Sequence, residues 1–139
     1  GDGPERLKSE QLCRKLGLDS KVTFLGKLKG IEKMLSIADV FLLPSKTESF
    51  GLVALEAMAS KVVVISSNTG GLPEVNVDGK TGYLSNVGDV NKMANDTINL
   101  LNDAEKLNAF KNNALAHART FDLPNILPKY ELVYQELSF

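Results

Sequence analysis

Two glutamates, eight positions apart, are the residues of this sequence whose type and spacing point to chemistry. Glu48 precedes a Ser-Phe-Gly turn, and Glu56 lies in an otherwise apolar run, residues 52–59. A helix that is apolar on all sides is usually buried, and a carboxylate is rarely buried without a polar partner, because an isolated buried charge is unfavourable. We therefore expect Glu56 to face a cleft and to meet a polar partner there. A glutamate at the rim of the fold, paired with a surface lysine, explains the spacing alone equally well.

The turn between the two glutamates is suited to bind an anion. Residues 41–44 have the pattern of the end of a buried strand, and Gly51 begins the helix that follows. The first amides of a helix lack internal acceptors and carry partial positive charge, so residues 49–53 can hold a phosphate. At ~1.5 Å per residue, Glu56 lies roughly 8 Å further along the helix axis, and Glu48 lies before the helix. A nucleoside diphosphate sugar, with phosphates in the middle and hydroxyls at both ends, has a matching layout.

A second stretch that could contact a ligand is the glycine-containing segment 67–71. Gly70 and Gly71 permit positive φ angles and a close approach of the backbone to another group. Taken alone, the segment is better interpreted as an ordinary flexible turn. Beside the two glutamates, we expect it to line the same site.

Alternating helices and strands must position these residues. We expect helices over residues 4–16, 31–37 and 51–60, and strands over 22–25, 39–43, 62–65 and 83–84. The run 62–65 is β-branched throughout, which is typical of a strand buried on both faces of a sheet. The alternation predicts an α/β fold, a Rossmann-like parallel sheet with helices on both faces. Ligands of such folds bind beyond the carboxyl ends of the strands, here at loops 26–30, 44–50 and 66–72.

The second half of the chain has a helical pattern. Asp89 and Asp103 are expected to cap two helices at their N-termini, and a third helix is expected to start between Pro124 and Pro128. His117 falls on this helical segment, and we expect no catalytic role for it. Leu7, Leu12 and Leu16 of the first helix are predicted to face inward. The later helices carry apolar residues at helical spacing: Val90, Met93, Ala94, Thr97, Ile98 and Leu101 on one face, then Leu107, Phe110, Ala114 and Ala118, and finally Tyr130, Val133, Tyr134 and Leu137.

Length and composition limit the classes of protein to consider. The 139 residues fit one domain. A formal net charge of -1 gives no reason to expect a nucleic acid or an anionic membrane as partner, and no apolar run approaches the ~20 residues of a membrane span. No group of residues has the spacing of metal ligands. Cys13 is the single cysteine, which fits a reducing cytoplasm.

The stretch ESFGLVALEAMA at residues 48–59 has the form Glu-x7-Glu, and residues 1–4, 22–26, 37–40, 70–75 and 78–84 carry further motifs in a fixed order. Together they resemble the retaining glycosyltransferases of family 4, which have the GT-B fold. The resemblance covers the whole chain but only the later part of the family's C-terminal domain. Residues 45–47 and 83–89 are most similar to the bacterial enzymes that transfer N-acetylglucosamine to L-malate. The sequence departs from the family at Lys61 and Val63, where Gly and Pro are usual.

The resemblance implies a role for each predicted site residue. Glu56 would bind the ribose hydroxyls of UDP, and the amides of residues 51–53 would hold a phosphate. Glu48, as the catalytic residue, and the backbone of residues 49–50 would contact the hexose, while residues 70–71 would lie beside the sugar and the acceptor. Residues 26–27 would hold the base through backbone contacts. The complete predicted site is Gly26, Lys27, Glu48, Ser49, Phe50, Gly51, Leu52, Val53, Glu56, Gly70 and Gly71.

The resemblance also implies the reaction and its partners. A hexose, N-acetylglucosamine, would pass from a UDP-sugar to a small acceptor such as L-malate with its anomeric configuration retained, and no metal or other cofactor would take part. An N-terminal acceptor domain would belong to the same full-length, cytoplasmic protein, and the family's Arg/Lys pair for the diphosphate would precede Gly1. We therefore expect the chain to be an inactive fragment that binds UDP weakly and can self-associate. A GT-B nucleotide-sugar epimerase and a non-catalytic nucleotide-sugar binding module are the alternatives.

Overall fold

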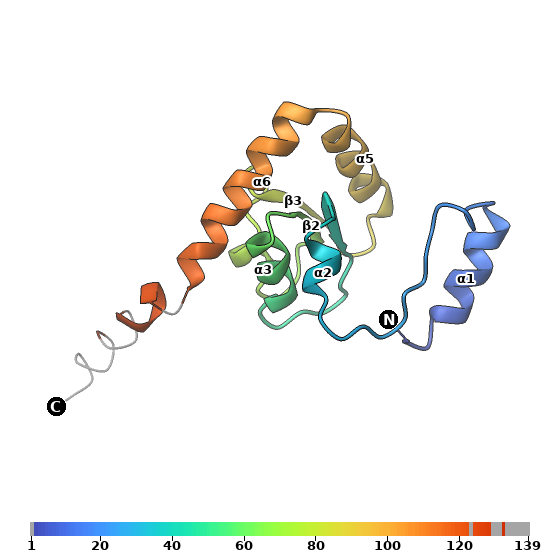
Figure 1. Cartoon of the computed structure of the whole chain (residues 1–139), viewed down its shortest axis with the longest axis horizontal. Helices are drawn as coiled ribbons and strands as arrows, with labels where there is room; N and C mark the ends of the chain where they lie inside the picture. Colours follow the sequence, from blue (N-terminus) through green and yellow to red (C-terminus); the bar gives the residue numbers. More distant parts are fainter. Residues whose placement is uncertain (1, 123, 129–131, 133–139) are drawn as a thin grey trace. The chain divides into compact units, whose positions relative to one another are not determined.

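The computed structural model describes residues 2–122, 124–128 and 132 of the chain (Figure 1). Two compact units make up the structure, Gly1–Ile31 and Glu32–Phe139. The first unit contains one helix, and the second contains the sheet and the remaining helices. No helix among the described residues is both long and apolar enough to cross a membrane.

The first unit is built on helix α1, Arg6–Lys15. Gly17 ends it as predicted, because its φ of +66° lets its amide turn back to the Arg14 carbonyl at 3.0 Å. The expectation that Leu7, Leu12 and Leu16 face inward is wrong, since all three are exposed. The expected strand 22–25 is also not formed. A strand needs a neighbour for its backbone groups, and without a sheet this small unit offers the leucines no surface to pack on.

The second unit is organised around three parallel strands (Figure 1). These are β1, Val40–Leu43, β2, Val63–Ser67, and β3, Gly82–Ser85, in the order β1-β2-β3. All five residues of β2 are buried, as predicted for the β-branched run, because β2 is the central strand. The strand extends two residues beyond the prediction, to Ser67, so the following loop begins later than expected.

Helices and a 3-10 turn accompany the sheet. They are α2, Glu32–Leu35; α3, Leu52–Ala59; α4, Leu72–Val75; α5, Val90–Leu101; α6, Ala104–Ala118; and η1, Arg119–Phe121. One core cluster joins Val63 and Ile65 of β2 to Leu100 of α5 and Phe110 of α6. Helix α3 contacts β2 and buries Ala54, Ala57 and Met58. The predicted α/β, Rossmann-like fold is confirmed.

The predicted caps of α5 and α6 are confirmed, whereas the apolar face predicted for α5 is covered only in part, with Met93 packed against the core cluster. Asp89 accepts a hydrogen bond from the Lys92 amide, and Asp103 accepts one from the Lys106 amide. The buried residue of α5 is Leu100, whereas Val90, Ile98 and Leu101 are exposed. Because α5 carries apolar residues on more than one face, a three-stranded sheet covers only part of them. In the same way α3 buries one side only, and its Leu52 is exposed.

The last predicted helix lies partly outside the described residues. Residues 124–128 and 132 are helical. The predicted apolar stripe on this helix cannot be compared with the structure, because its four members, Tyr130, Val133, Tyr134 and Leu137, lie outside the described part of the chain.

Helix α3 ends in a turn at Lys61. The Lys61 amide donates to the Met58 carbonyl and the Val62 amide to the Ala57 carbonyl, both at 3.0 Å. This pattern of bonds requires a left-handed residue after the helix, a position usually occupied by glycine. Lys61 accordingly has a φ of +62°, the only positive φ of a non-glycine residue in the described part of the chain.

Candidate functional site

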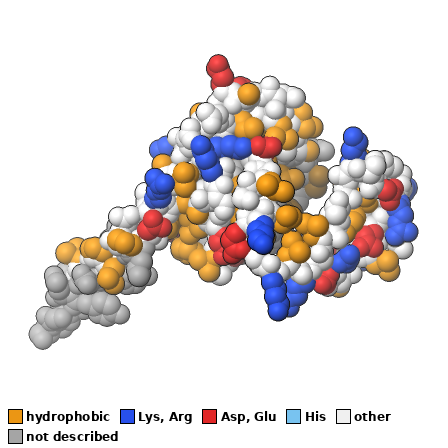
Figure 2. Space-filling view, viewed as in Figure 1, with side chains coloured by type: hydrophobic (Ala, Val, Ile, Leu, Met, Phe, Trp, Pro, Cys, Tyr) orange, Lys and Arg blue, Asp and Glu red, His pale blue; other side chains and the backbone are white. Residues whose placement is uncertain are grey.

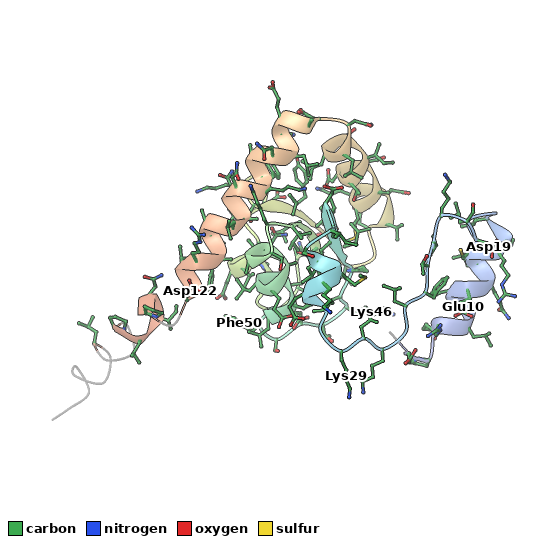
Figure 3. The ribbon with its side chains drawn as sticks, in the orientation of Figure 1. Glu10, Asp19, Lys29, Lys46, Phe50 and Asp122 are labelled. Atoms are coloured by element: carbon green, nitrogen blue, oxygen red, sulfur yellow. The ribbon has the colours of Figure 1, made fainter. Side chains whose placement is uncertain are left out.

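The predicted site lies on the loop that connects β1 to α3. In Figure 3, the labelled Lys46 and Phe50 lie on this loop, at one end of the second unit. Because the loop follows the carboxyl end of a parallel strand, it occupies the position at which ligands bind in folds of this class. Glu48, Ser49 and Phe50 belong to the loop, and Gly51 is the residue before the helix.

The N-terminus of α3 has no side-chain cap. The first bonds of the helix run from the amides of Ala54 and Leu55 to the Gly51 carbonyl, at 2.9 and 3.2 Å. The amides of residues 51–53 therefore have no acceptor among the described residues, although α5 and α6 are each capped by an aspartate. Unpaired amides at a helix N-terminus attract negative charge, so the end of α3 has the properties of a phosphate site.

Glycine is required at the start of α3. Gly51 has a φ of +93°, which L side chains rarely adopt, and a methyl group in its place would lie 2.9 Å from Cδ2 of Leu72. Leu72 begins α4 and is fully buried. Gly51 is therefore fixed by the packing of α4 against the turn, as well as by its own backbone conformation.

Gly70 and Gly71 bring the second predicted stretch against the first. A methyl group on Gly70 would lie 1.5 Å from the carbonyl oxygen of Glu48, and one on Gly71 would lie 2.8 Å from that of Ser49. The Gly71 amide also donates a hydrogen bond to the Ser49 carbonyl at 3.2 Å. The two segments therefore touch backbone to backbone, and the structure brings together these parts of the predicted site.

The two glutamates lie on either side of the uncapped turn. Glu48 is half-buried, and its Oε1 accepts a bond from the amide of the next residue, Ser49, at 3.2 Å. Glu56 lies on the second turn of α3 and is exposed, and its carboxylate makes no hydrogen bond or ion pair with any described residue. Neither the polar partner nor the surface lysine expected for Glu56 is found in the described part of the chain. Both carboxylates are free to accept from a ligand.

Phe50 is held by an aromatic contact with the far end of the chain. The rings of Phe50 and Phe121 meet edge to face, with 6.4 Å between their centres, and Phe121 makes a similar contact of 5.3 Å with His117. Edge-to-face pairs stabilise by about 0.5–1.5 kcal/mol. The only histidine of the sequence therefore packs against a phenylalanine that in turn contacts the loop.

Gly26 and Lys27 lie in the first unit, whereas all other predicted site residues lie in the second. Gly26 has a φ of +69°, and a methyl group there would lie 3.0 Å from Nη1 of Arg6. The Lys27 amide donates to Oδ2 of Asp2 at 3.2 Å. The Lys27 amide therefore already has an acceptor within its own unit. The hydrogen bond and ion pair that Asp2 and Glu10 make with Arg6 raise the pKa of the Arg6 guanidinium.

An apolar cavity of about 240 Å³ lies at the carboxyl ends of β1 and β2, where Pro44 and Ser67 belong to its lining. Leu42, Pro44, Val90, Met93 and Ala94 form most of its wall. Figure 2 shows apolar side chains exposed on the surface of this unit, and Leu42 and Val90 are among the exposed residues. The cavity contains neither glutamate and none of the free amides, so it is distinct from the site on the α3 turn.

The sequence pattern did not single out the hydroxyl groups of Ser67 and Thr69, which donate hydrogen bonds to the carbonyls of Ser45 and Lys46. Their signal was the run of small polar residues directly after the β-branched strand, Ser66 to Thr69. Hydroxyl residues at the carboxyl end of a buried strand can bond only to neighbouring loops or to a ligand, which makes them candidates for a site.

Comparisons with known proteins show that the chain is similar to glycosyltransferases. The chain is 41% identical over 138 residues to the N-acetyl-alpha-D-glucosaminyl L-malate synthase of Bacillus anthracis, covering 99% of this chain and 36% of that protein. It is 37% identical over 141 residues to the D-inositol 3-phosphate glycosyltransferase of Corynebacterium urealyticum, covering 99% and 33%. The chain therefore spans about a third of the length of these curated relatives.

Among solved structures, Anabaena HepE in complex with UDP-glucose superposes with a TM-score of 0.85 at 28% identity, covering 98% of this chain and 38% of that one. The model of the family described as glycosyl transferases group 1 matches residues 1–117. This match covers the α3 turn, both glutamates and the two glycines that pack against them. The chain therefore belongs to the group 1 glycosyl transferases, and its fold is that of the GT-B enzymes.

Proposed function

We propose that the chain is the donor-binding part of a family 4 retaining glycosyltransferase, which transfers N-acetylglucosamine from a UDP-sugar to L-malate. The observation that carries the proposal is the uncapped N-terminus of α3, with Glu48 on the loop that precedes it. The solved complex of HepE with UDP-glucose supports a nucleotide-sugar donor. The relative from Bacillus anthracis supports the sugar and the acceptor.

The free amides of α3 are proposed to bind the diphosphate. A phosphate oxygen would accept from the amides of Gly51, Leu52 and Val53, which no side chain satisfies in the described structure. The charge of the phosphate then interacts favourably with the helix dipole. Glu56, on the next turn, would accept from the ribose hydroxyls, and such hydrogen bonds to a charged group contribute about 1.5–3 kcal/mol.

Glu48 and the adjacent backbone are proposed to contact the hexose. In the reaction, the bond from the anomeric carbon to the diphosphate oxygen breaks, and the acceptor oxygen bonds to the same face of the sugar while its proton passes to the leaving diphosphate. Catalysis would come mainly from holding the two substrates in place and from stabilising the charge of the leaving diphosphate at the α3 amides. Gly70 and Gly71 would lie beside the sugar. As the resemblance to the family implies, the proposed reaction uses no metal and no other cofactor.

The remaining assignments stay predictions. These are contacts from Gly26 and Lys27 to the base, an N-terminal acceptor domain in the full-length protein, and a cytoplasmic location. For Lys27, the bond between its amide and Asp2 leaves its carbonyl as the group that could meet the base.

The test is an assay of the full-length protein with UDP-N-acetylglucosamine and a set of acceptors. L-malate and D-inositol 3-phosphate, named for the two relatives, are the first to compare. We expect release of UDP that depends on L-malate, and a product whose anomeric proton shows the same configuration as the donor. Epimerisation of the sugar without an acceptor would instead support an epimerase. UDP-sugar binding without turnover of any acceptor would support a binding module.

A further inference from the structure

We propose that the hydroxyl groups of Ser67 and Thr69 are positioning groups that fix the backbone of the Glu48 turn, and thereby the direction of the Glu48 carboxylate. The inference rests on the proposed function of this turn in binding the donor sugar. It assigns to two side chains that contact no ligand a part in setting the geometry of the site.

Three hydrogen bonds connect Ser67, the last residue of β2, and the segment that follows it to the loop after β1. Ser67 Oγ donates to the Ser45 carbonyl at 2.5 Å, and Thr69 Oγ1 donates to the Lys46 carbonyl at 3.3 Å. The Gly71 amide donates to the Ser49 carbonyl at 3.2 Å. These three bonds are called the 67–71 clamp below.

The donors of the clamp alternate along the chain. Ser67 ends β2, and residues 68–71 form a bend and a turn, with a φ of +55° at Gly70. Gly70 also lies against the loop, at the Glu48 carbonyl, whereas Asn68 joins the segment to the end of β3. Its amide donates to the Ser85 carbonyl at 2.8 Å, and its Nδ2 donates to Oδ1 of Asn86 at 3.1 Å. The clamp is therefore bonded to the end of β3 as well, so it holds the loop after β1 in a fixed position relative to the sheet.

The carboxylate of Glu48 depends on the backbone that the clamp holds. Its only hydrogen bond to a described residue is local, from the Ser49 amide, so no distant side chain sets its direction. The Glu48 carbonyl lies against Gly70, in the middle of the clamp. Ser67 is 1% exposed, so removing its hydroxyl leaves the Ser45 carbonyl without that donor and admits no water readily.

The test compares variants of the full-length protein that lose one hydroxyl each. Thr69→Val removes the donor and keeps the shape of the side chain, and Thr69→Ser restores the donor. Thr97→Val is the matched control, because Thr97 Oγ1 also donates to a carbonyl, that of Met93 at 2.7 Å, but on α5. Ser67→Ala tests the second hydroxyl and, being a smaller side chain, keeps the inference testable if Thr69→Val does not fold.

Two measurements are made on each variant. The first is amide hydrogen exchange of the peptide that covers residues 45–51, where loss of one hydrogen bond should speed exchange by about tenfold in Thr69→Val and Ser67→Ala. The second is steady-state kinetics with the UDP-sugar, where kcat should fall about tenfold while KM for the donor changes little, since a misplaced group lowers turnover more than binding. Thr69→Ser and Thr97→Val should behave as the parent in both.

Exchange and kcat equal to those of the parent in Thr69→Val and Ser67→Ala would overturn the inference. So would a fall in kcat of the same size in Thr97→Val, or no recovery in Thr69→Ser. A parent protein without glycosyl transfer activity would contradict the proposed function instead. In that case, faster exchange confined to residues 45–51 would still support the positioning of the turn, and unchanged exchange would still exclude it.

Discussion

Gly70 and Glu48 touch so closely that a single methyl group on Gly70 would lie 1.5 Å from the Glu48 carbonyl oxygen. Two residues 22 positions apart are therefore in direct backbone contact, and this contact holds the turn that carries the catalytic candidate. The contact explains why the second stretch has glycine there, independently of any ligand.

Gly70→Ala is predicted to destabilise the turn by at least about 3 kcal/mol, because the new methyl group cannot fit and the φ of +55° is unfavourable for alanine. Gly79→Ala separates the two causes. Gly79 has a φ of +71° but no atom within 4 Å of the added methyl group, so its change should cost only about 1–2 kcal/mol. Denaturant unfolding of both full-length variants measures the difference, and equal losses of stability would contradict the steric explanation.

The fold could be predicted where local sequence determines structure. The β-branched run of β2 and the capping aspartates of α5 and α6 each carry their own signal, and all three were found where expected. The strand expected at 22–25 was wrong, because a strand depends on a partner that local sequence does not reveal. The apolar face predicted for α5 is covered only in part for a similar reason, since the sheet decides which of several apolar faces is covered.

The candidate site was predictable where its residues are neighbours in the sequence. Glu48, Glu56 and the glycine before α3 belong to one continuous stretch, so their order along a turn and a helix follows from the sequence. The clamp from Ser67 and Thr69 joins residues more than 20 positions apart, and serine and threonine occur in most loops. A tertiary contact made by common residue types leaves only a weak local pattern, here the run of small polar residues from Ser66 to Thr69.

Asn76→Asp is predicted to destabilise the protein by about 3 kcal/mol or more at neutral pH, because it places an unpaired charge in the core. The fully buried Asn76 Nδ2 donates to the carbonyls of Val64 and Tyr83 and to Ser66 Oγ, and Oδ1 accepts from Thr81 Oγ1. An aspartate would turn its oxygen toward those carbonyls. Urea unfolding of the full-length protein measures the loss.

The control for this change is Asn113→Asp. Asn113 also donates through Nδ2 to a carbonyl, that of Lys80 at 3.1 Å, but it is only half-buried and this bond is open to solvent. Its change should stay within about 1 kcal/mol, as for most surface substitutions. If the two variants lost equal stability, burial of Asn76 would not be the cause.

Lys61→Gly is predicted to stabilise the protein by about 0.5–1 kcal/mol. The gain is the relief of a left-handed side chain, partly offset by the greater freedom of glycine in the unfolded chain. Lys61→Ala, which removes the charge and most of the side chain but keeps the strain, should leave stability near that of the parent. The midpoint of urea unfolding measures the stability of both variants. If Lys61→Ala gained as much stability as Lys61→Gly, the positive φ of Lys61 would not be the reason.

Substitutions of the two glutamates are predicted to have different effects, one on UDP binding and the other on turnover. Glu56→Gln should weaken UDP binding roughly fivefold in the full-length protein, because a charge-assisted hydrogen bond becomes a neutral one. Glu48→Ala should lower turnover of the UDP-sugar while UDP affinity stays nearly unchanged, because Glu48 lies on the hexose side of the turn. Calorimetry with UDP and steady-state kinetics separate the two roles. If Glu56→Gln bound UDP as tightly as the parent, Glu56 would not bind the ribose. If Glu48→Ala lost UDP affinity together with turnover, Glu48 would not act on the hexose alone.

The most direct measurement of the central claim is a titration of the full-length, isotope-labelled protein with UDP, followed through its amide resonances. The amides of Gly51, Leu52 and Val53 have no acceptor in the described structure, whereas those of Lys92 and Lys106, at the starts of α5 and α6, are bonded to aspartates. We predict large shifts at residues 51–53 that saturate with UDP, and none at Lys92 or Lys106. UDP binding that leaves the amides of residues 51–53 unchanged would contradict the claim that this helix end holds the donor.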